Sequence, residues 1–303
     1  MANTRYENFV IENKLNELLN TSLAMNQFLT VDNTLQEEAG MIKKVHRYSS
    51  TGAGQDVQEG AGNNTAIEMS YSATPYTVGT YQARFIYTDE DAMADPFLVD
   101  AGIQNLAKDI VNDYNHKAII EWGKGTHRVG TTTFDFDAFA DALAELDLED
   151  VDEANFFALC SVDDRAELRK NLKDTLQYVE ANARTGYVGS VCGVPIYTSK
   201  AVFKGEIFLA NKEAVSAFMK KDTEIAQARD ENTRTNTVYA RNVKVIALTN
   251  NDKVCKISKY EAGVPSSNPK TEGFFEYGDN GYVATTDTTK ASGKTYYKLV
   301  VAA

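Results

Sequence analysis

The chain has 303 residues, of which 31 are basic and 43 acidic, so its formal net charge is −12 at pH 7. A protein that binds nucleic acid regardless of sequence needs a basic surface to displace counterions from the phosphates. The acidic balance therefore argues against tight DNA binding, although it is compatible with a surface that merely encloses DNA. No run of 18 apolar residues occurs, so no membrane-spanning helix is predicted.

The cysteines and the N-terminus indicate a cytoplasmic folding environment. Cys160, Cys192 and Cys255 lie far apart and form no CxxC pair, so we interpret them as reduced, structural thiols. The first seven residues, MANTRYE, contain neither a basic start nor an apolar segment. We therefore expect no signal peptide.

A long helix is predicted over residues 95–123. Asp95 suits the N-cap, Pro96 suits the first helical position, and Gly123 suits the C-terminal stop. Between them, one apolar stripe consists of Val99, Ile103, Leu106, Ile110 and Tyr114. At about 1.5 Å per residue the helix would be roughly 40 Å long. We expect it to act as a spine for the other elements; a long core helix of an α/β enzyme is the alternative.

The segment before this helix, residues 45–90, is rich in Thr, Ser, Gly and Tyr, and its alternating residues predict strands. Its centre is a soft turn region that contains Gly52, Gly54, Gly60 and Gly62. A long two-stranded hairpin cannot bury a face alone, so we expect another subunit to provide the partner surface. Residues 8–29 carry a partial helical face, which indicates a helix on its own domain or an arm on a neighbour.

Beyond the spine, short helices and buried strands alternate. Helices are expected from Asp135 onwards, from Ser161 to about Arg184, and from Asn211 through Met219. Strands are expected at residues 155–160, 191–197, 206–210, 243–248 and 254–257, and residues 222–242 are expected to be extended. A linker at residues 263–269 leads to three short strands at residues 274–277, 281–284 and 294–301. This last segment is too small for its own core, so it should pack on the main body or on a neighbour.

The search for chemistry identifies no catalytic residue, no metal ligand set and no cofactor site. His46, His116 and His127 form no HExxH or HxH pattern. Residues 123–130 look like a phosphate-binding loop, but their spacing is wrong and they follow a helix rather than a strand. No GxSxG and no Cys–His pattern with local context occurs, and nothing singles out a carboxylate pair. The chain is therefore interpreted as one that assembles rather than one that catalyses.

The order of these elements resembles the major capsid protein of tailed double-stranded DNA bacteriophages, the Hong Kong 97 fold. The matching phrases are Thr30-Val31-Asp32, Glu38-Ala39-Gly40-Met41, Gly193-Val194-Pro195-Ile196-Tyr197, and a late block with Phe208-Leu209, Met219, Glu224, Arg229-Asp230 and Val243-Lys244-Val245. The likeness covers about residues 1–260 and depends on the combination and order of these phrases.

The resemblance implies an α+β fold with six parts. These are an N-terminal arm (residues 1–44), an extended loop formed by a β-hairpin (45–90), a peripheral domain with the spine helix (91–130), an axial domain (131–221), a return to the peripheral domain (222–260), and a linker with a small appended β module (261–303). The module resembles short β modules on phage structural proteins and is expected on the outer capsid surface.

The resemblance also implies a function. The chain would be a structural subunit that self-assembles into pentamers and hexamers, forming the icosahedral head shell that encloses double-stranded DNA without sequence-specific binding. It would assemble in the host bacterial cytoplasm, with portal and scaffold proteins as candidate further partners. Glu224, Arg229 and Asp230 are candidate inter-subunit ion pairs, with a solvated charge run as the alternative. The glycines Gly52, Gly54, Gly60 and Gly62 would let the hairpin tip fit non-equivalent neighbours.

The sequence differs from the family pattern in two ways, and each difference leads to an expectation. Some members have about a hundred extra N-terminal scaffold residues, whereas the spine here begins by residue 95, so such a segment is expected to be absent or cleaved. Some members join a loop lysine covalently to a neighbour, whereas no lysine lies between Arg47 and Lys108, so no such crosslink is expected. The rival interpretations are an encapsulin-type nanocompartment shell, a phage tail or tail-tube protein, and a catalytic α/β protein.

Overall fold

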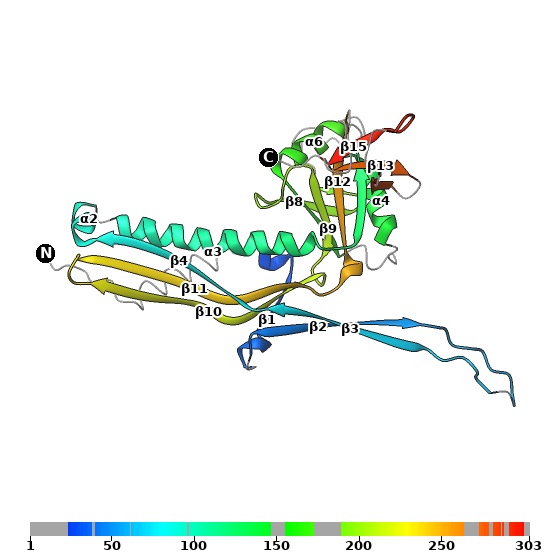
Figure 1. Cartoon of the computed structure of the whole chain (residues 1–303), viewed down its shortest axis with the longest axis horizontal. Helices are drawn as coiled ribbons and strands as arrows, with labels where there is room; N and C mark the ends of the chain where they lie inside the picture. The colour runs from blue at the N-terminus through cyan, green and yellow to red at the C-terminus, as the bar shows by residue number, and fades with distance from the viewer. Residues whose placement is uncertain are drawn as a thin grey trace.

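The computed structural model describes residues 24–37, 40–60, 62–95, 97–146, 155–172, 189–263, 273–278, 281–285, 287 and 291–299. Figure 1 shows three parts: a long helix lying on a long sheet, a compact α/β part at one end of that helix, and a thin hairpin that projects from the body. The predicted arm before residue 24 lies outside the described residues. The described chain begins with a short 3-10 helix, η1 (Ala24–Gln27).

The spine is α3 (Leu98–Trp122), preceded by a separate short helix, α2 (Asp89–Ala94). The helix thus starts three residues later than the sequence predicts, because the carboxylate of Asp95 accepts from the N–H of Phe97 in a turn. The predicted apolar stripe is confirmed, since all five of its members are buried. Gly123 is confirmed as the C-cap, although its backbone is right-handed (φ −64°) rather than left-handed.

Under α3 lies a four-stranded sheet in the order β1-β10-β11-β4, counted over the described residues. Its strands are β1 (Thr30–Asp32), β10 (Val215–Asp230), β11 (Thr235–Leu248) and β4 (Gly79–Thr88). β10 and β11 run antiparallel along the length of the spine (Figure 1). The extended character predicted for residues 222–242 is therefore confirmed.

The helix predicted from Asn211 through Met219 is wrong, because this stretch turns and then enters β10. The side-chain oxygen of Asn211 accepts from the N–H of Glu213, and the N–H of Ala214 bonds to the carbonyl of Asn211, which closes a tight turn. The following residues then pair with β1 on one side and β11 on the other. Cross-strand pairing of both edges overrides the local helix propensity. The expected boundary between residues 221 and 222 therefore falls inside one continuous strand.

The hairpin consists of β2 (Ile42–Thr51) and β3 (Glu68–Thr77), which pair antiparallel in a sheet of their own. The expected extended loop, residues 45–90, also includes β4, and this part of the assignment is wrong. β4 pairs with β11 over ten residues and belongs to the sheet under α3. The excursion that leaves the body is therefore shorter than expected and ends at Thr77.

The compact part holds a second sheet, whose described strands follow the order β14-β13-β15-β12-β9-β6-β8-β7, with β5 also paired to β12. The strands are β5 (His127–Thr131), β6 (Phe156–Cys160), β7 (Ser190–Val191), β8 (Val194–Thr198), β9 (Glu206–Asn211), β12 (Val254–Gly263), β13 (Phe274–Gly278), β14 (Gly281–Ala284) and β15 (Tyr296–Leu299). The helices described in this part include α4 (Phe136–Leu146) and α6 (Val162–Asn171). Residues 123–130, whose sequence looks like a phosphate-binding loop, are a turn followed by the start of β5.

The 3-10 helices η2 (Thr34–Gln36) and η4 (Asn251–Lys253) lie before β2 and before β12. Ser161 caps α6 as predicted, and its hydroxyl accepts from the N–H of Asp164 at 3.2 Å. The expected continuation of this helix beyond Leu172, and the linker from residue 264, lie outside the described residues. The three C-terminal strands are confirmed, and they join the main body because β15 pairs with β12.

Candidate assembly surfaces

The hairpin has two chemically different faces. Residues that pair across an antiparallel ladder share a face, and successive residues alternate between faces. From the register of β2 and β3, one face, here called the aromatic face, contains Ile42, Lys44, His46, Tyr48, Ser50, Met69, Tyr71, Ala73, Pro75 and Thr77. The other, here called the anchored face, contains Lys43, Val45, Arg47, Ser49, Thr51, Glu68, Ser70, Ser72, Thr74 and Tyr76.

The anchored face attaches the hairpin base to its own body. Val45 is buried in a cluster with side chains of β10 and β11, which include Phe218 and Val245. Arg47 donates from Nη2 to the carbonyl of Leu248 at 3.0 Å, and the Lys43 ammonium lies 4.9 Å from the ring centre of Phe218. Beyond Arg47 this face becomes polar and is dominated by hydroxyls, for example those of Ser49 and Ser70, which are hydrogen-bonded to each other.

The aromatic face is uncovered where the hairpin leaves the body. Tyr48 is 68% exposed, Met69 64% and Tyr71 60%. The Tyr71 ring stacks on His46 at 5.4 Å between centroids and lies 5.8 Å from the Tyr48 ring. These rings pack against one another, and the two tyrosines still present most of their surface to solvent. Beyond Arg47 the hairpin therefore has its large apolar side chains on the side away from its own attachment.

The four predicted tip glycines lie in the segment that follows β2 and precedes β3, and they differ in what they require. Gly52 has φ +101°, and a Cβ there would lie 2.6 Å from the carbonyl oxygen of Ala66, so both backbone and space demand glycine. Gly60 also has a positive φ, +83°. A Cβ on Gly54 or Gly62 would meet nothing within 4 Å. Their contact with another subunit stays a prediction.

The three predicted charged contacts all lie on or at the end of β10, and each has partners in its own chain. Glu224 accepts from Arg241 at 2.8 and 3.2 Å and pairs with Lys221. The hydrogen bonds from Arg241 and Lys221 lower the pKa of Glu224 to about 2. Their role between subunits stays a prediction.

The other two charged residues stabilise the β10–β11 turn and its junction with α2. Arg229 pairs with Asp89 at 2.9 Å and with Glu231 at 3.0 Å. Asp230 accepts from the backbone N–H of Asn232, and this hydrogen bond lowers the pKa of Asp230. Within one subunit these charges therefore hold the distal end of the long sheet together.

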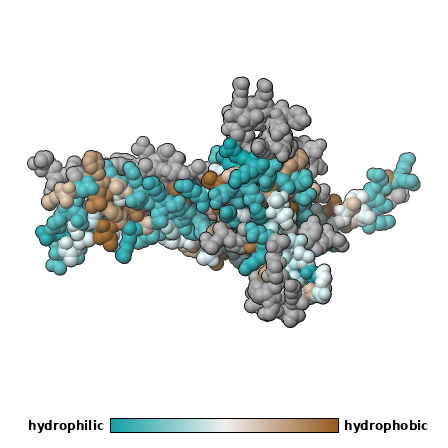
Figure 2. Space-filling model, turned by 90° about the horizontal axis from the view of Figure 1, so that it is seen from above, coloured by the Kyte–Doolittle hydropathy of each residue, from teal (hydrophilic) through white to brown (hydrophobic). Residues whose placement is uncertain are grey.

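A second exposed apolar region lies at the distal corner, defined as residues 89–100, where α2 meets α3. Met93 is 68% exposed and Phe97 is 76% exposed. Figure 2 shows hydrophobic residues at this end of the body, beside a largely hydrophilic surface. The corner also has five carboxylates, from Asp89, Glu90, Asp91, Asp95 and Asp100. Sequence reasoning missed this region because it assigned the start of the corner to the hairpin and the rest to the buried spine.

A charged layer interrupts the apolar packing between α3 and the long sheet. The Lys244 side chain, from β11, is 2% exposed, and its Nζ lies 3.4 Å from Asp113 Oδ2 and 4.8 Å from the ring centre of Tyr114. Asp113 also pairs with Lys117 at 2.9 Å. Burial lowers the pKa of Lys244 to about 8, although the nearby Asp113 carboxylate opposes this shift.

This layer, here called the polar belt (Tyr81, Asp109, Asp113, Lys117 and Lys244), separates two apolar clusters under the same helix. One cluster contains Ile103 and Ile110, and the other contains Ile119 and Trp122. The β10–β11 register shifts at the same level, next to the pair of Met219 with Lys244. Sequence reasoning missed the belt because Val243-Lys244-Val245 has the pattern of a strand whose lysine faces solvent.

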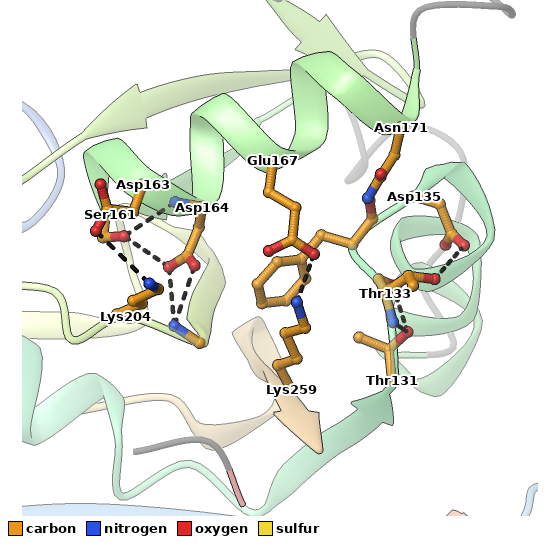
Figure 3. Close-up of polar contacts among 12 residues, drawn as sticks. Thr131, Thr133, Asp135, Ser161, Asp163, Asp164, Glu167, Asn171, Lys204 and Lys259 are labelled. Carbon is orange, nitrogen blue, oxygen red and sulfur yellow. Dashed lines mark hydrogen bonds and ion pairs between the residues drawn. The ribbon is translucent and has the colours of Figure 1, made fainter. Parts of the chain in front are cut away.

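Acidic side chains in the compact part form a cluster that resembles a functional site, but their contacts link elements of the fold to one another (Figure 3). Asp164 is buried, and its two carboxylate oxygens accept from the N–H of Gly205 at 3.1 and 3.0 Å. Glu167 pairs with Lys259 at 2.6 Å, and Asn171 donates to the carbonyl of Phe134. These contacts join α6 to β12 and to the segments before α4 and β9.

A groove lies beside the short strand β1 and has a volume of about 560 Å³. Its lining residues are Thr30, Val31, Asp32, Asn33, Thr34, Glu37, Ser216, Phe218 and Thr249. The N–H of Thr34 donates to Asp32 at 2.8 Å and lowers the pKa of this carboxyl. In the described part of the chain, no group of three His, Cys, Asp or Glu residues is placed to hold a metal ion. No described helix is both long enough and apolar enough to cross a membrane.

Comparison of the whole fold with solved structures gives consistent matches. A capsid protein of the native GTA particle superposes with a TM-score of 0.64 at 12% identity, over 78% of this chain and 90% of that one. The mature capsid of bacteriophage PhiM1 gives 0.63 at 11% identity, over 88% and 90%. The SrpI encapsulin of Synechococcus elongatus gives 0.56 at 12% identity, over 78% and 86%. No protein-family model and no curated protein sequence matches the chain.

The chain therefore has the α+β fold of phage major capsid proteins, the Hong Kong 97 fold, as the order of its elements indicates. The encapsulin match shows that the same fold also builds shells of another kind. Because sequence identity is 12% or lower in these three comparisons, the likeness is one of fold.

Proposed function

We propose that this chain is the major capsid protein of a tailed phage, a structural subunit whose copies form pentamers and hexamers in the icosahedral head. The observation that supports this most directly is the hairpin, whose aromatic face lies uncovered on a body with the capsid fold. A two-stranded hairpin is marginal in water on its own. A neighbouring subunit would supply the missing layer.

In this proposal the parts have the roles that the fold family suggests. The segment before residue 45 is the arm, and the hairpin is the extended loop. The α3 layer with the long sheet is the peripheral domain, the compact part is the axial domain, and β13–β15 form a module appended to it. Double-stranded DNA is enclosed rather than bound in a sequence-specific way, which suits a net charge of −12. Portal and scaffold proteins are further partners, and assembly takes place in the bacterial cytoplasm.

We propose that subunits are held together without a lysine crosslink from the outer hairpin. No lysine lies between Arg47 and Lys108, and the hairpin lysines Lys43 and Lys44 lie at its base. Denaturing electrophoresis of intact particles is expected to give the 33.4 kDa monomer. A ladder of covalent multimers would contradict this part of the proposal.

The test of the proposed function is electron microscopy of the purified protein expressed alone, with light scattering alongside. Closed shells, tubes or five- and six-membered rings are the expected result. If the protein stays monomeric, the experiment is repeated with the neighbouring scaffold gene co-expressed, and a monomer in both cases would contradict the proposal. Shells that contain a specific cargo protein instead of DNA in the native host would favour the encapsulin-type alternative.

A further inference from the structure

We propose that one side of the spine helix, together with the loop between β8 and β9, faces the enclosed double-stranded DNA and contacts its phosphates. This inference rests on the proposed function, because it names the surface through which a shell of acidic subunits meets DNA. The surface on α3, here called the spine stripe, consists of Gln104, Asn105, Lys108, Asn112, His116 and Ile120. Helical spacing places these six residues on one side of α3.

The spine stripe lies on the side of α3 that the chain leaves open. Figure 1 shows the long sheet on one side of α3, while the opposite side is open along most of its length. Figure 2 looks onto this side and shows a largely hydrophilic surface along the body. All six residues of the stripe are exposed, so the stripe is available to a partner.

The acidic residues of the same stretch of helix lie beside the stripe and are engaged elsewhere. Between residues 101 and 120 the helix has two carboxylates, those of Asp109 and Asp113. Asp109 accepts from the hydroxyl of Tyr81 at 2.6 Å, and Asp113 pairs with Lys117 at 2.9 Å in the polar belt. The stripe itself therefore contains no carboxylate, although the chain as a whole has a net charge of −12.

The chemistry of the stripe suits a phosphate backbone. Besides Lys108 it has three side-chain amides, from Gln104, Asn105 and Asn112. Lysine, asparagine and glutamine side chains are among the groups that contact DNA phosphates, and such contacts carry no sequence information. A duplex has one negative charge per about 1.7 Å of its axis, so carboxylates on the facing surface would repel it.

The loop between β8 and β9 extends this surface at the C-terminal end of the stripe. The Phe203 ring lies edge-on to the His116 ring, with 6.3 Å between centroids. Lys200 and Lys204 flank this phenylalanine in the sequence, and both are exposed. Asp163 lies 4.0 Å from Lys204, and both side chains are more than half exposed. Such a surface pair is weak, so the loop adds positive charge.

Another exposed helix face shows the opposite pattern. On α4, Asp137, Asp141 and Glu145 are exposed and recur every four residues, so they form one acidic ridge. α4 contains no basic residue. The two helices thus differ in charge, and DNA is expected to face the spine stripe rather than the ridge on α4. With few lysines for each subunit, each contact is weak and non-specific, which agrees with DNA that is enclosed rather than tightly bound.

The first experiment measures how fast single lysines are acetylated by acetic anhydride in DNA-filled particles and in the same particles after the DNA has been released. Lys108 and Lys200 are expected to react at least about threefold more slowly in filled particles, because phosphates cover their amines and keep them protonated. Lys170, which is exposed near the end of α6, is the control and is expected to react equally fast in both. Equal rates for Lys108 in the two states, or equal protection of Lys170, would overturn the inference.

The second experiment adds one carboxylate to either side of the same layer. Gln104→Glu changes the spine stripe, and Gln82→Glu is the matched control. Gln82 is exposed on the face of the long sheet away from α3, since its neighbour Ala83 is buried under the helix. Both substitutions keep the size of the side chain and change the net charge equally. Phage that carry each variant are compared by counting filled and empty particles in the electron microscope.

Both variants are expected to form as many shells as the parent. Gln104→Glu should lower the ratio of filled to empty particles at least about threefold, because every copy adds a charge that repels phosphate, while Gln82→Glu should leave the ratio unchanged. Equal ratios, or a larger loss for Gln82→Glu, would overturn the inference and leave the proposed function standing. If the parent chain forms no shell, alone and with scaffold, the proposed function fails and the inference fails with it.

Discussion

Two antiparallel strand pairs of this chain, β10–β11 and β2–β3, differ in what covers them. The inward residues of β10 and β11, such as Ile225 and Val238, are buried under α3. β2 and β3 have a continuous register of ten pairs, yet beyond Arg47 both faces are open to solvent. The comparison shows that strand pattern and pairing alone do not stabilise an element, and that a covering layer must come either from the chain itself or from a neighbour.

The largest expected difference between these regions is in how much the free energy of unfolding falls when an apolar side chain is removed. Ile103→Ala creates a cavity under α3 and is expected to lower the free energy of unfolding of the subunit by about 2–5 kcal/mol. Tyr71→Ala removes an exposed side chain and is expected to change it by less than about 0.5 kcal/mol, while it abolishes particle formation. Urea unfolding of the unassembled subunits, with microscopy, measures both quantities. Equal destabilisation by the two variants would show that the hairpin packs within its own subunit.

Within the body, the polar belt is expected to respond differently to the loss of each partner. Asp113→Asn leaves the buried ammonium of Lys244 without its counter-ion and is expected to destabilise the subunit by about 3–5 kcal/mol. Lys244→Met leaves Asp113 paired with Lys117 and is expected to be neutral or stabilising by up to about 4 kcal/mol. Chemical unfolding at pH 7 compares the two. A Lys244→Met variant that loses as much stability as Asp113→Asn would mean that the buried charge itself supports the fold.

The same lysine gives the stability of the body a pH dependence. The pKa of Lys244 is about 8 in the folded chain and 10.5 for an ordinary lysine, so the unfolded chain binds more protons between these values. Stability linked to Lys244 should therefore be lowest below pH 8 and should rise above it, by at most about 1.4 kcal/mol per pH unit. The difference in unfolding free energy between wild type and Lys244→Met, measured from pH 7 to 9.5, isolates this effect. A constant difference across the range would contradict it.

The smallest effect on the subunit is expected at the hairpin tip. Gly52→Ala places a Cβ close to the carbonyl of Ala66 at a positive φ. It is expected to destabilise the native conformation of the tip by about 1–3 kcal/mol. Gly54→Ala, where a Cβ meets nothing, is the matched control. Because the tip is not coupled to the core, global unfolding should be unchanged for both variants, while Gly52→Ala alone lowers the yield of particles. Equal yields from the two variants would show that assembly does not depend on the tip geometry.

The sequence predicts the parts of the fold that depend on local periodicity. The apolar stripe of α3 and the alternation in β2 and β3 are visible in the chain, because each element buries or exposes residues at a regular spacing. The helix assigned to residues 211–219 fails because pairing with β1 and β11, which are distant in sequence, decides that segment. The assignment of β4 to the hairpin fails for the same reason, since its partner β11 lies about 150 residues later.

The candidate surfaces could be predicted only in outline. The glycines of the tip predict a turn. Only the fold shows that position 52 requires glycine and position 54 does not. The division of the hairpin into two faces needs the register of β2 with β3, and a shift of one residue would exchange the faces. The buried position of Lys244 depends on how β11 packs against α3, which no local pattern encodes.

Hydrogen exchange, compared between unassembled subunits and assembled particles, tests the central claim most directly. If a neighbouring copy covers the hairpin, the amides of β2 and β3 beyond Arg47 should exchange rapidly in the subunit and become strongly protected in particles. The amides of β10 and β11 under α3 should be protected in both states. Hairpin amides that exchange equally fast in both states would contradict the claim that the hairpin is completed by a second copy of the chain.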